Sequence, residues 1–128
     1  MSVVVGYIPN EYGEAALREA LLEAQRRGTG VIVVNTTRGD SLVDKKYVGD
    51  SGRKELEQRF SAASVDVELR QSMGTDVADE ILAVVREVAA EALVIGIRHR
   101  TQVGKLLMGS VATRLLLEAP CPVVAVKP

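Results

Sequence analysis

The residues whose types and spacing could bind a ligand lie in one stretch near the end of the chain, from Val94 to Ser110. An apolar segment ends at Gly96, and Gly109 and Ser110 stand where a helix is expected to begin. Glycines allow a ligand to approach the backbone closely, and the free N–H groups at a helix start attract anions. We therefore predict an anion site here, and we also expect Ser110 to be the N-cap residue of the helix.

Positive charge gathers in the same part of the chain. Segment 92–117 contains no Asp or Glu, and its four basic residues give it a charge of +4, whereas the whole chain carries −1. These residues are Arg98, Arg100, Lys105 and Arg114. His99 lies among them, and an imidazole protonated near neutral pH can donate to a phosphate. The pattern favours a polyphosphate ligand, although each basic side chain alone would also suit a solvated surface.

Groups that could catalyse a reaction or bind a metal are scarce. The chain has one histidine, His99, and one cysteine, Cys121, which cannot by themselves fill a metal site of three or four ligands. Cys121 lies between two prolines with no helix start to activate its thiol, so we expect it to pack as a small apolar residue. The sequence therefore indicates no dedicated catalytic centre.

Short apolar segments alternate with amphipathic segments along the chain. The expected strands are Val3–Val5, Val31–Val34, Val65–Leu69, Leu93–Ile95 and Val123–Val126, with the third at a sheet edge. The expected helices run from about Gly13 to Gly28, around Leu56, Phe60 and Ala63, from Asp76 to Val88, and from Ala112 to Ala119. Segment 38–51 is polar and is expected to be a long loop. This alternation predicts a single α/β domain of three layers, a parallel sheet with helices on both faces, which binds ligands beyond the carboxyl ends of its strands.

The bulk composition limits the classes of protein that this chain can represent. Its 128 residues, 47% hydrophobic and 26% charged, suffice for one domain with its own core. A net charge of −1 argues against a nucleic-acid partner, and no apolar run approaches the roughly 18 residues of a membrane span. A single cysteine cannot form an internal disulfide, and the first residues do not resemble a signal peptide, so we expect a cytoplasmic protein.

The stretch from Gly96 to Ser110 resembles the nucleotide-binding motif of the universal stress protein family, Gly-x2-Gly-x9-Gly-Ser/Thr. Gly96 matches the first glycine, and Gly109 with Ser110 matches the last pair at the same spacing. The segments 74–95 and 110–126 also resemble the family, and the resemblance covers essentially the whole chain. It implies a universal stress protein domain over residues 1–128, with an adenine nucleotide alpha hydrolase-like, Rossmann-like fold whose strand order is 3-2-1-4-5.

The resemblance implies a non-enzymatic regulatory protein that binds ATP or a related adenine nucleotide, such as AMP or ADP. Backbone groups of Gly109, Ser110 and Val111 would hold the phosphates, Gly96 would admit the ribose, and Thr36 would border the adenine. Mg²⁺ is expected only together with a bound nucleotide. The expected site residues are Thr36, Ile95, Gly96, Arg98, His99, Gly109, Ser110 and Val111.

Two positions depart from the family pattern. His99 replaces the second glycine, and Ile8 stands where nucleotide binders usually carry an Asp. These departures favour a second interpretation, a dimeric interaction module of the same fold that binds no nucleotide. A third interpretation is an enzyme of the related adenine-nucleotide-hydrolysing superfamily, whose Ser-Gly-Gly-type phosphate loop is replaced here by Gly6–Pro9. Because the family usually dimerises through the last strand, we expect a homodimer through Val123–Val126.

Overall fold

A computed structural model describes residues 2–37, 47–74, 76–97 and 109–128. Strands and helices alternate as predicted, and the strands form one parallel five-stranded sheet in the order β3-β2-β1-β4-β5. In chain order the elements are β1 (Ser2–Gly6), α1 (Glu11–Arg27), β2 (Gly30–Thr37), α2 (Asp50–Ser61), β3 (Val67–Met73), α3 (Val77–Glu87), β4 (Ala92–Gly96), α4 (Ser110–Glu118) and β5 (Val123–Val126). The predicted fold class and strand order are confirmed.

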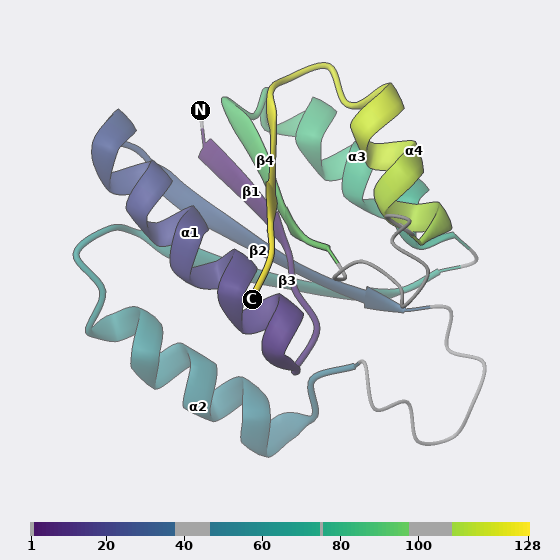
Figure 1. Cartoon of the computed structure of the whole chain (residues 1–128). Helices are drawn as coiled ribbons and strands as arrows, with labels where there is room; N and C mark the ends of the chain where they lie inside the picture. The colour runs from purple at the N-terminus through teal and green to yellow at the C-terminus, as the bar shows by residue number, and fades with distance from the viewer. Residues whose placement is uncertain (1, 38–46, 75, 98–108) are drawn as a thin grey trace.

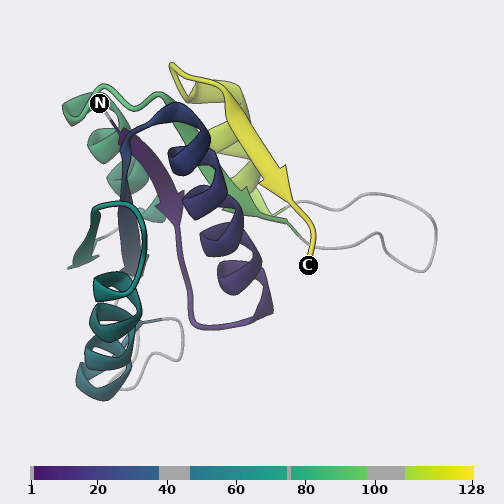
Figure 2. The same cartoon turned by 90° about the vertical axis from the view of Figure 1, so that its left-hand side faces the viewer.

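The helices cover both faces of the sheet and make a three-layer molecule. Helices α1 and α2 lie on one face, and α3 and α4 lie on the other (Figure 1). Successive residues of a strand point to opposite faces, so β1 sends Val3 and Val5 into the core under α1 and Val4 into the core under α3. The view turned by 90° shows β5 at one edge of the sheet, beside β4 (Figure 2).

Polar side chains and glycine set the ends of α1 and the start of α3. The Asn10 side chain accepts a hydrogen bond from the Gly13 N–H at 3.0 Å, so α1 begins at Glu11, earlier than its apolar pattern predicted. Gly28 ends the helix with a φ of 64°, which confirms the predicted stop. Asp76 caps α3 in the same way as Asn10, by accepting from the Asp79 N–H at 2.9 Å.

Other boundaries differ from the sequence prediction as well. Helix α2 begins at Asp50, inside the segment expected to be a loop, and residues 38–46 of that segment lie outside the described residues. Strand β3 begins at Val67 rather than Val65, although its edge position is confirmed. Strand β2 continues past Val34 to Thr37 because β3 pairs with it along its whole carboxyl half, which satisfies the backbone of a polar segment.

A candidate anion site at the carboxyl edge of the sheet

The candidate site lies where the carboxyl ends of the central strands meet. Strands β1 and β4 are direct neighbours, with Val5 paired to Val94, so the segments that follow Gly6 and Gly96 leave the sheet side by side. Helix α4 connects two parallel strands, β4 and β5, and it therefore begins at this same edge (Figure 1). The predicted site residues Arg98 and His99, which follow the buried Ile97, lie outside the described residues.

The first turn of α4 has the features of an anion site. Gly109 is the N-cap residue, with φ −65° and ψ 162°, and no side chain caps the helix. The first helical bond runs from the Thr113 N–H to the Gly109 carbonyl, so the N–H groups of Ser110 and Val111 precede the helical ladder. No acidic side chain of this first turn competes for them. Within the described residues these N–H groups have no helical acceptor, which suits them to receive an anion.

The role expected of Ser110 as an N-cap is wrong. Ser110 is the first residue inside α4, and the cap before it is Gly109. Because the cap residue is a glycine, it has no side-chain oxygen that could bond to the N–H groups of this helix start. Ser110 is exposed and Val111 is half-buried, so the backbone of the helix start remains accessible.

The two glycines of the motif have different surroundings. A Cβ added to Gly109 would meet no described atom within 4 Å, so the position tolerates a side chain. A Cβ added to Gly96 would lie 2.4 Å from the carbonyl oxygen of Tyr12, in the first turn of α1. The packing of α1 against the end of β4 therefore explains this glycine without a ligand. A ribose near Gly96 stays a prediction.

The side chains of Thr36 and Ile95 are already engaged within the fold. Thr36 is only 4% exposed, and its hydroxyl oxygen accepts a hydrogen bond of 3.0 Å from the Ser72 hydroxyl of β3. Ile95 packs in the core under α3, together with Ile32. Both residues lie near the carboxyl edge, where only their backbone or a rearranged side chain could contact a ligand.

A buried polar cluster around Asn35, beside Thr36, was not identified from the sequence. The Asn35 amide donates to the Tyr7 carbonyl at 2.9 Å, and its oxygen accepts from the Val48 N–H at 2.8 Å and from Gln71 at 3.2 Å. These bonds fix the β1–α1 connection, the start of the α2 segment and β3 to one another. The only sequence signal is an asparagine that directly follows an apolar strand.

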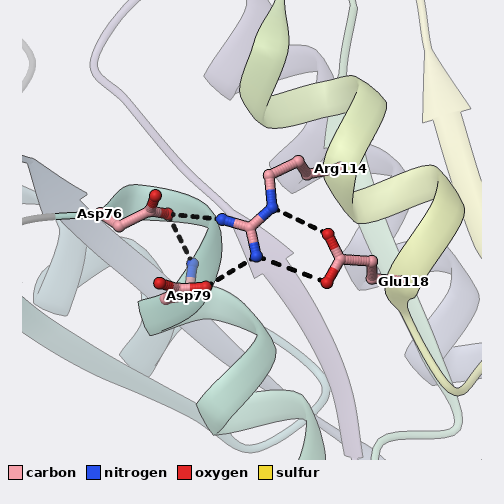
Figure 3. A network of polar contacts seen from close by, with 4 residues as sticks. All are labelled: Asp76, Asp79, Arg114 and Glu118. Carbon is pink, nitrogen blue, oxygen red and sulfur yellow. Dashed lines mark hydrogen bonds and ion pairs between the residues drawn. The ribbon is translucent and has the colours of Figure 1, made fainter.

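The structure leaves less positive charge available at the site than the sequence suggests. Arg114 is bonded to three carboxylates, Asp76 and Asp79 of the α3 start and Glu118 of its own helix (Figure 3). The bond with Glu118 contributes most to raising the pKa of Arg114, and the same pair lowers the pKa of Glu118. Arg114 therefore cannot supply a free charge to a polyphosphate, and the other three basic residues of the segment lie outside the described residues.

Cys121 packs as predicted. It is half-buried against the core under α3 and α4, and burial raises the pKa of its thiol, which keeps it protonated and unreactive near neutral pH. Within the described part of the chain, no three His, Cys, Asp or Glu side chains gather in a way that could hold a metal ion. The helices of the described residues are all too short or too polar to cross a membrane.

A parallel sheet in the order 3-2-1-4-5, covered by helices on both faces, places the chain among α/β proteins of the adenine nucleotide alpha hydrolase-like fold. The chain belongs to the universal stress protein family, which it matches over residues 1–127. A universal stress protein of Mycolicibacterium smegmatis is 48% identical over 126 residues, which cover 98% of this chain and 97% of the relative.

Two solved structures of this family carry nucleotides. The universal stress protein of Archaeoglobus fulgidus in complex with dAMP is 28% identical, with a TM-score of 0.65, and the match covers 98% of this chain and 96% of that one. A universal stress protein in complex with cAMP is 25% identical, with a TM-score of 0.69 and the same coverage of 98% and 96%. Both ligands combine an adenine base with a phosphate group.

Proposed function

We propose that this chain is a regulatory universal stress protein of one domain, residues 1–128, that binds ATP or a related adenine nucleotide and is not an enzyme. The observation that carries the proposal is the start of α4 at the carboxyl edge, where the cap is a glycine with open space around it and the N–H groups of Ser110 and Val111 precede the first helical bond. A helix start without an acidic residue or a side-chain cap is suited to bind a phosphate.

In this proposal each part of the nucleotide has a place. The phosphates bind the backbone of Gly109, Ser110 and Val111, the ribose lies near Gly96, and the adenine lies beside Thr36. Ile95 borders the ribose from the end of β4, and Arg98 with His99 adds positive charge. The dAMP and cAMP bound by the two related proteins support an adenine nucleotide as the ligand class. Any Mg²⁺ arrives with the phosphates, and the free thiol of Cys121 fits the reducing cytoplasm.

Replacing Gly109 with valine tests the proposal, because the new side chain would cover the helix start. Gly109→Val is expected to abolish ATP binding in calorimetry, while thermal unfolding stays near that of the parent chain since the position is open. Gly49→Val is the matched control. Gly49 is the N-cap of α2, also has no described atom within 4 Å of an added Cβ, and should leave ATP binding unchanged.

Two results would contradict the proposal. The parent chain could show no affinity for ATP, ADP or AMP at millimolar concentration, which would remove nucleotide binding altogether. Alternatively, Gly109→Val could bind as tightly as the parent chain, which would move the phosphates away from the start of α4. Mass spectrometry of the small molecules that copurify with the protein would identify the nucleotide directly.

A second candidate function is a dimeric interaction module that needs no nucleotide. The packing around Gly96 favours this function. A Cβ added there would lie 2.4 Å from the carbonyl oxygen of Tyr12, so the fold explains the glycine without a nucleotide. Ile8, in place of the usual aspartate, points the same way. In both candidates the chain forms a homodimer through Val123–Val126, so only the nucleotide titration separates them.

A further inference from the structure

Arg114 joins the two helices on one face of the sheet through a four-residue cluster. Its guanidinium donates from Nη1 to Asp76 at 3.0 Å, from Nη2 to Asp79 at 2.7 Å, and from Nε to Glu118 at 2.8 Å (Figure 3). We call these four residues the Arg114 cluster. Every guanidinium nitrogen is engaged, so the direction of the side chain is fixed by bonds on three sides.

Among the described residues, the first half of α4 is only partly buried against the core. The helix has nine residues, and among its side chains only Leu115 is fully buried. Val111 and Ala112 pack against the core but remain half-buried. Helix α3, by contrast, buries Ala78, Ile81, Leu82 and Val85, so it is the firmly anchored partner. The Arg114 cluster therefore ties a loosely packed helix to a well-packed one.

The point of attachment on α3 is itself fixed. The same Asp76 oxygen that receives Arg114 also caps α3 by accepting from the Asp79 N–H at 2.9 Å. Both helices begin at the carboxyl edge of the sheet, and Arg114 lies one helical turn after Ser110 (Figure 1). A bond that fixes this turn also fixes where the N–H groups of Ser110 and Val111 point.

We propose that Arg114 is a positioning residue that orients the start of α4 for phosphate binding, although it does not itself contact the nucleotide. This inference rests on the proposed function, because it assigns a role toward the same phosphates. The Arg114 guanidinium also offsets part of the negative charge of Asp76, Asp79 and Glu118, which would repel a bound phosphate.

The test compares ATP with adenosine, because only ATP uses the helix start. Arg114→Gln is expected to weaken ATP binding about tenfold in a nuclear magnetic resonance titration, whereas adenosine binding should change less than about twofold. Arg70→Gln is the matched control. The Arg70 side chain is 34% exposed against 35% for Arg114, and it likewise bridges carboxylates, Glu68 and Glu87, but at the other end of α3. This variant should bind both ligands as the parent chain does.

A second variant separates orientation from charge and also serves if Arg114→Gln does not fold. Asp79→Asn removes one negative charge and replaces the charged bond between Arg114 and Asp79 with a weaker bond to a neutral amide oxygen. If only charge matters, ATP should bind more tightly to this variant, whereas a positioning role predicts weaker ATP binding with adenosine unchanged. Measurement at raised salt, which screens the charge effect, should leave the weakening in place.

The possible outcomes distinguish the two proposals. Selective loss of ATP affinity in Arg114→Gln, absent from Arg70→Gln, supports the positioning role. Unchanged ATP affinity, equal loss of ATP and adenosine, or tighter ATP binding by Asp79→Asn would overturn this role while nucleotide binding by the parent chain stands. A parent chain that binds no nucleotide would overturn the proposed function itself, and the inference with it.

Discussion

At the scale of single residues, the two motif glycines Gly96 and Gly109 show that one sequence pattern can combine two physical causes. Gly109 stands in open space with φ −65°, a backbone conformation that most residues adopt, so nothing within the described fold requires glycine there. Gly96 faces the Tyr12 carbonyl, so the fold alone requires it. The packing of α1 therefore suffices to explain Gly96, whereas the described fold gives Gly109 no steric reason, only its place as the N-cap residue of α4.

Replacing Gly96 with alanine tests whether the packing of α1 against β4 requires a glycine at this position. The added Cβ would lie 2.4 Å from the Tyr12 carbonyl oxygen, and a backbone atom cannot move aside as a flexible side chain can. Gly96→Ala is therefore expected to lower the free energy of unfolding by about 2 kcal/mol in urea denaturation. Gly49→Ala, at a position with open space, is the control and should lower stability by clearly less, about 0.5 kcal/mol, because alanine is only a poorer N-cap residue there. Equal stability of the two variants would contradict the packing explanation.

At the scale of elements, three segments meet at Tyr7, just after β1. The Tyr7 hydroxyl donates to Glu14 of α1 at 3.3 Å, and Arg59 of α2 donates to the same carboxylate at 2.8 Å. Burial, followed by the nearby Glu14 charge, raises the pKa of Tyr7 from its ordinary 10.0 to about 12. Because α2 buries only Leu56, this contact is a substantial part of its attachment to the rest of the fold.

The raised pKa of Tyr7 predicts a loss of stability in alkali. The folded state holds the phenol proton more tightly than the unfolded state, so this contribution is complete below about pH 10 and is lost as pH rises toward about 12. Over that range the parent chain should lose about 2 kcal/mol more unfolding free energy than Tyr7→Phe, which has no phenol to titrate. Urea denaturation at pH 9, 10, 11 and 12 would measure the difference. An equal loss of unfolding free energy in the parent chain and in Tyr7→Phe would contradict this prediction.

The elements themselves were largely predictable, because their signals are local. Runs of β-branched residues gave the central strands, and Gly28 gave the end of α1. The sequence favours Ser110 as the cap of α4 because serine is a common N-cap residue with a side chain that can bond to the helix. The actual cap, Gly109, has no side chain and so gives no comparable sequence signal. The polar end of β2 was missed because its backbone is satisfied by β3, more than thirty residues further along the chain.

The charge balance of the site was not predictable for a similar reason. Arg114 was counted among the free basic residues of its segment, but two of its partners belong to α3, 35 and 38 residues earlier. No periodicity or spacing links residues so far apart in the chain; only the fold brings them together. Residue types at a site can thus be inferred from sequence, whereas the share of their charge left for a ligand requires the tertiary contacts.

At the scale of the whole molecule, β5 leaves one edge of the described sheet without a neighbouring strand (Figure 2). Leu93 donates to Pro122 and Ile97 donates to Val126, so the even-numbered residues of β5 bond to β4. The backbone groups of Val123 and Ala125 therefore point outward, where a second copy of the strand could pair with them. The preceding helix adds exposed apolar surface, since Leu117 is 79% exposed. These features fit the homodimer through Val123–Val126 that we propose.

A proline in β5 should prevent the strand from pairing with a second copy while its pairing with β4 stays intact. Ala125→Pro removes an outward N–H group but leaves the bonds of Val124 and Val126 to β4, so the chain should remain folded and become monomeric. Light scattering at micromolar concentration should give twice the chain mass of 13.7 kDa for the parent and the single mass for this variant, with circular dichroism as the check on folding. Met73→Pro places the same substitution at an exposed position of β3, on the opposite edge, and should remain dimeric. A monomeric parent chain, or an Ala125→Pro variant that stays dimeric, would show that β5 is not the contact between copies.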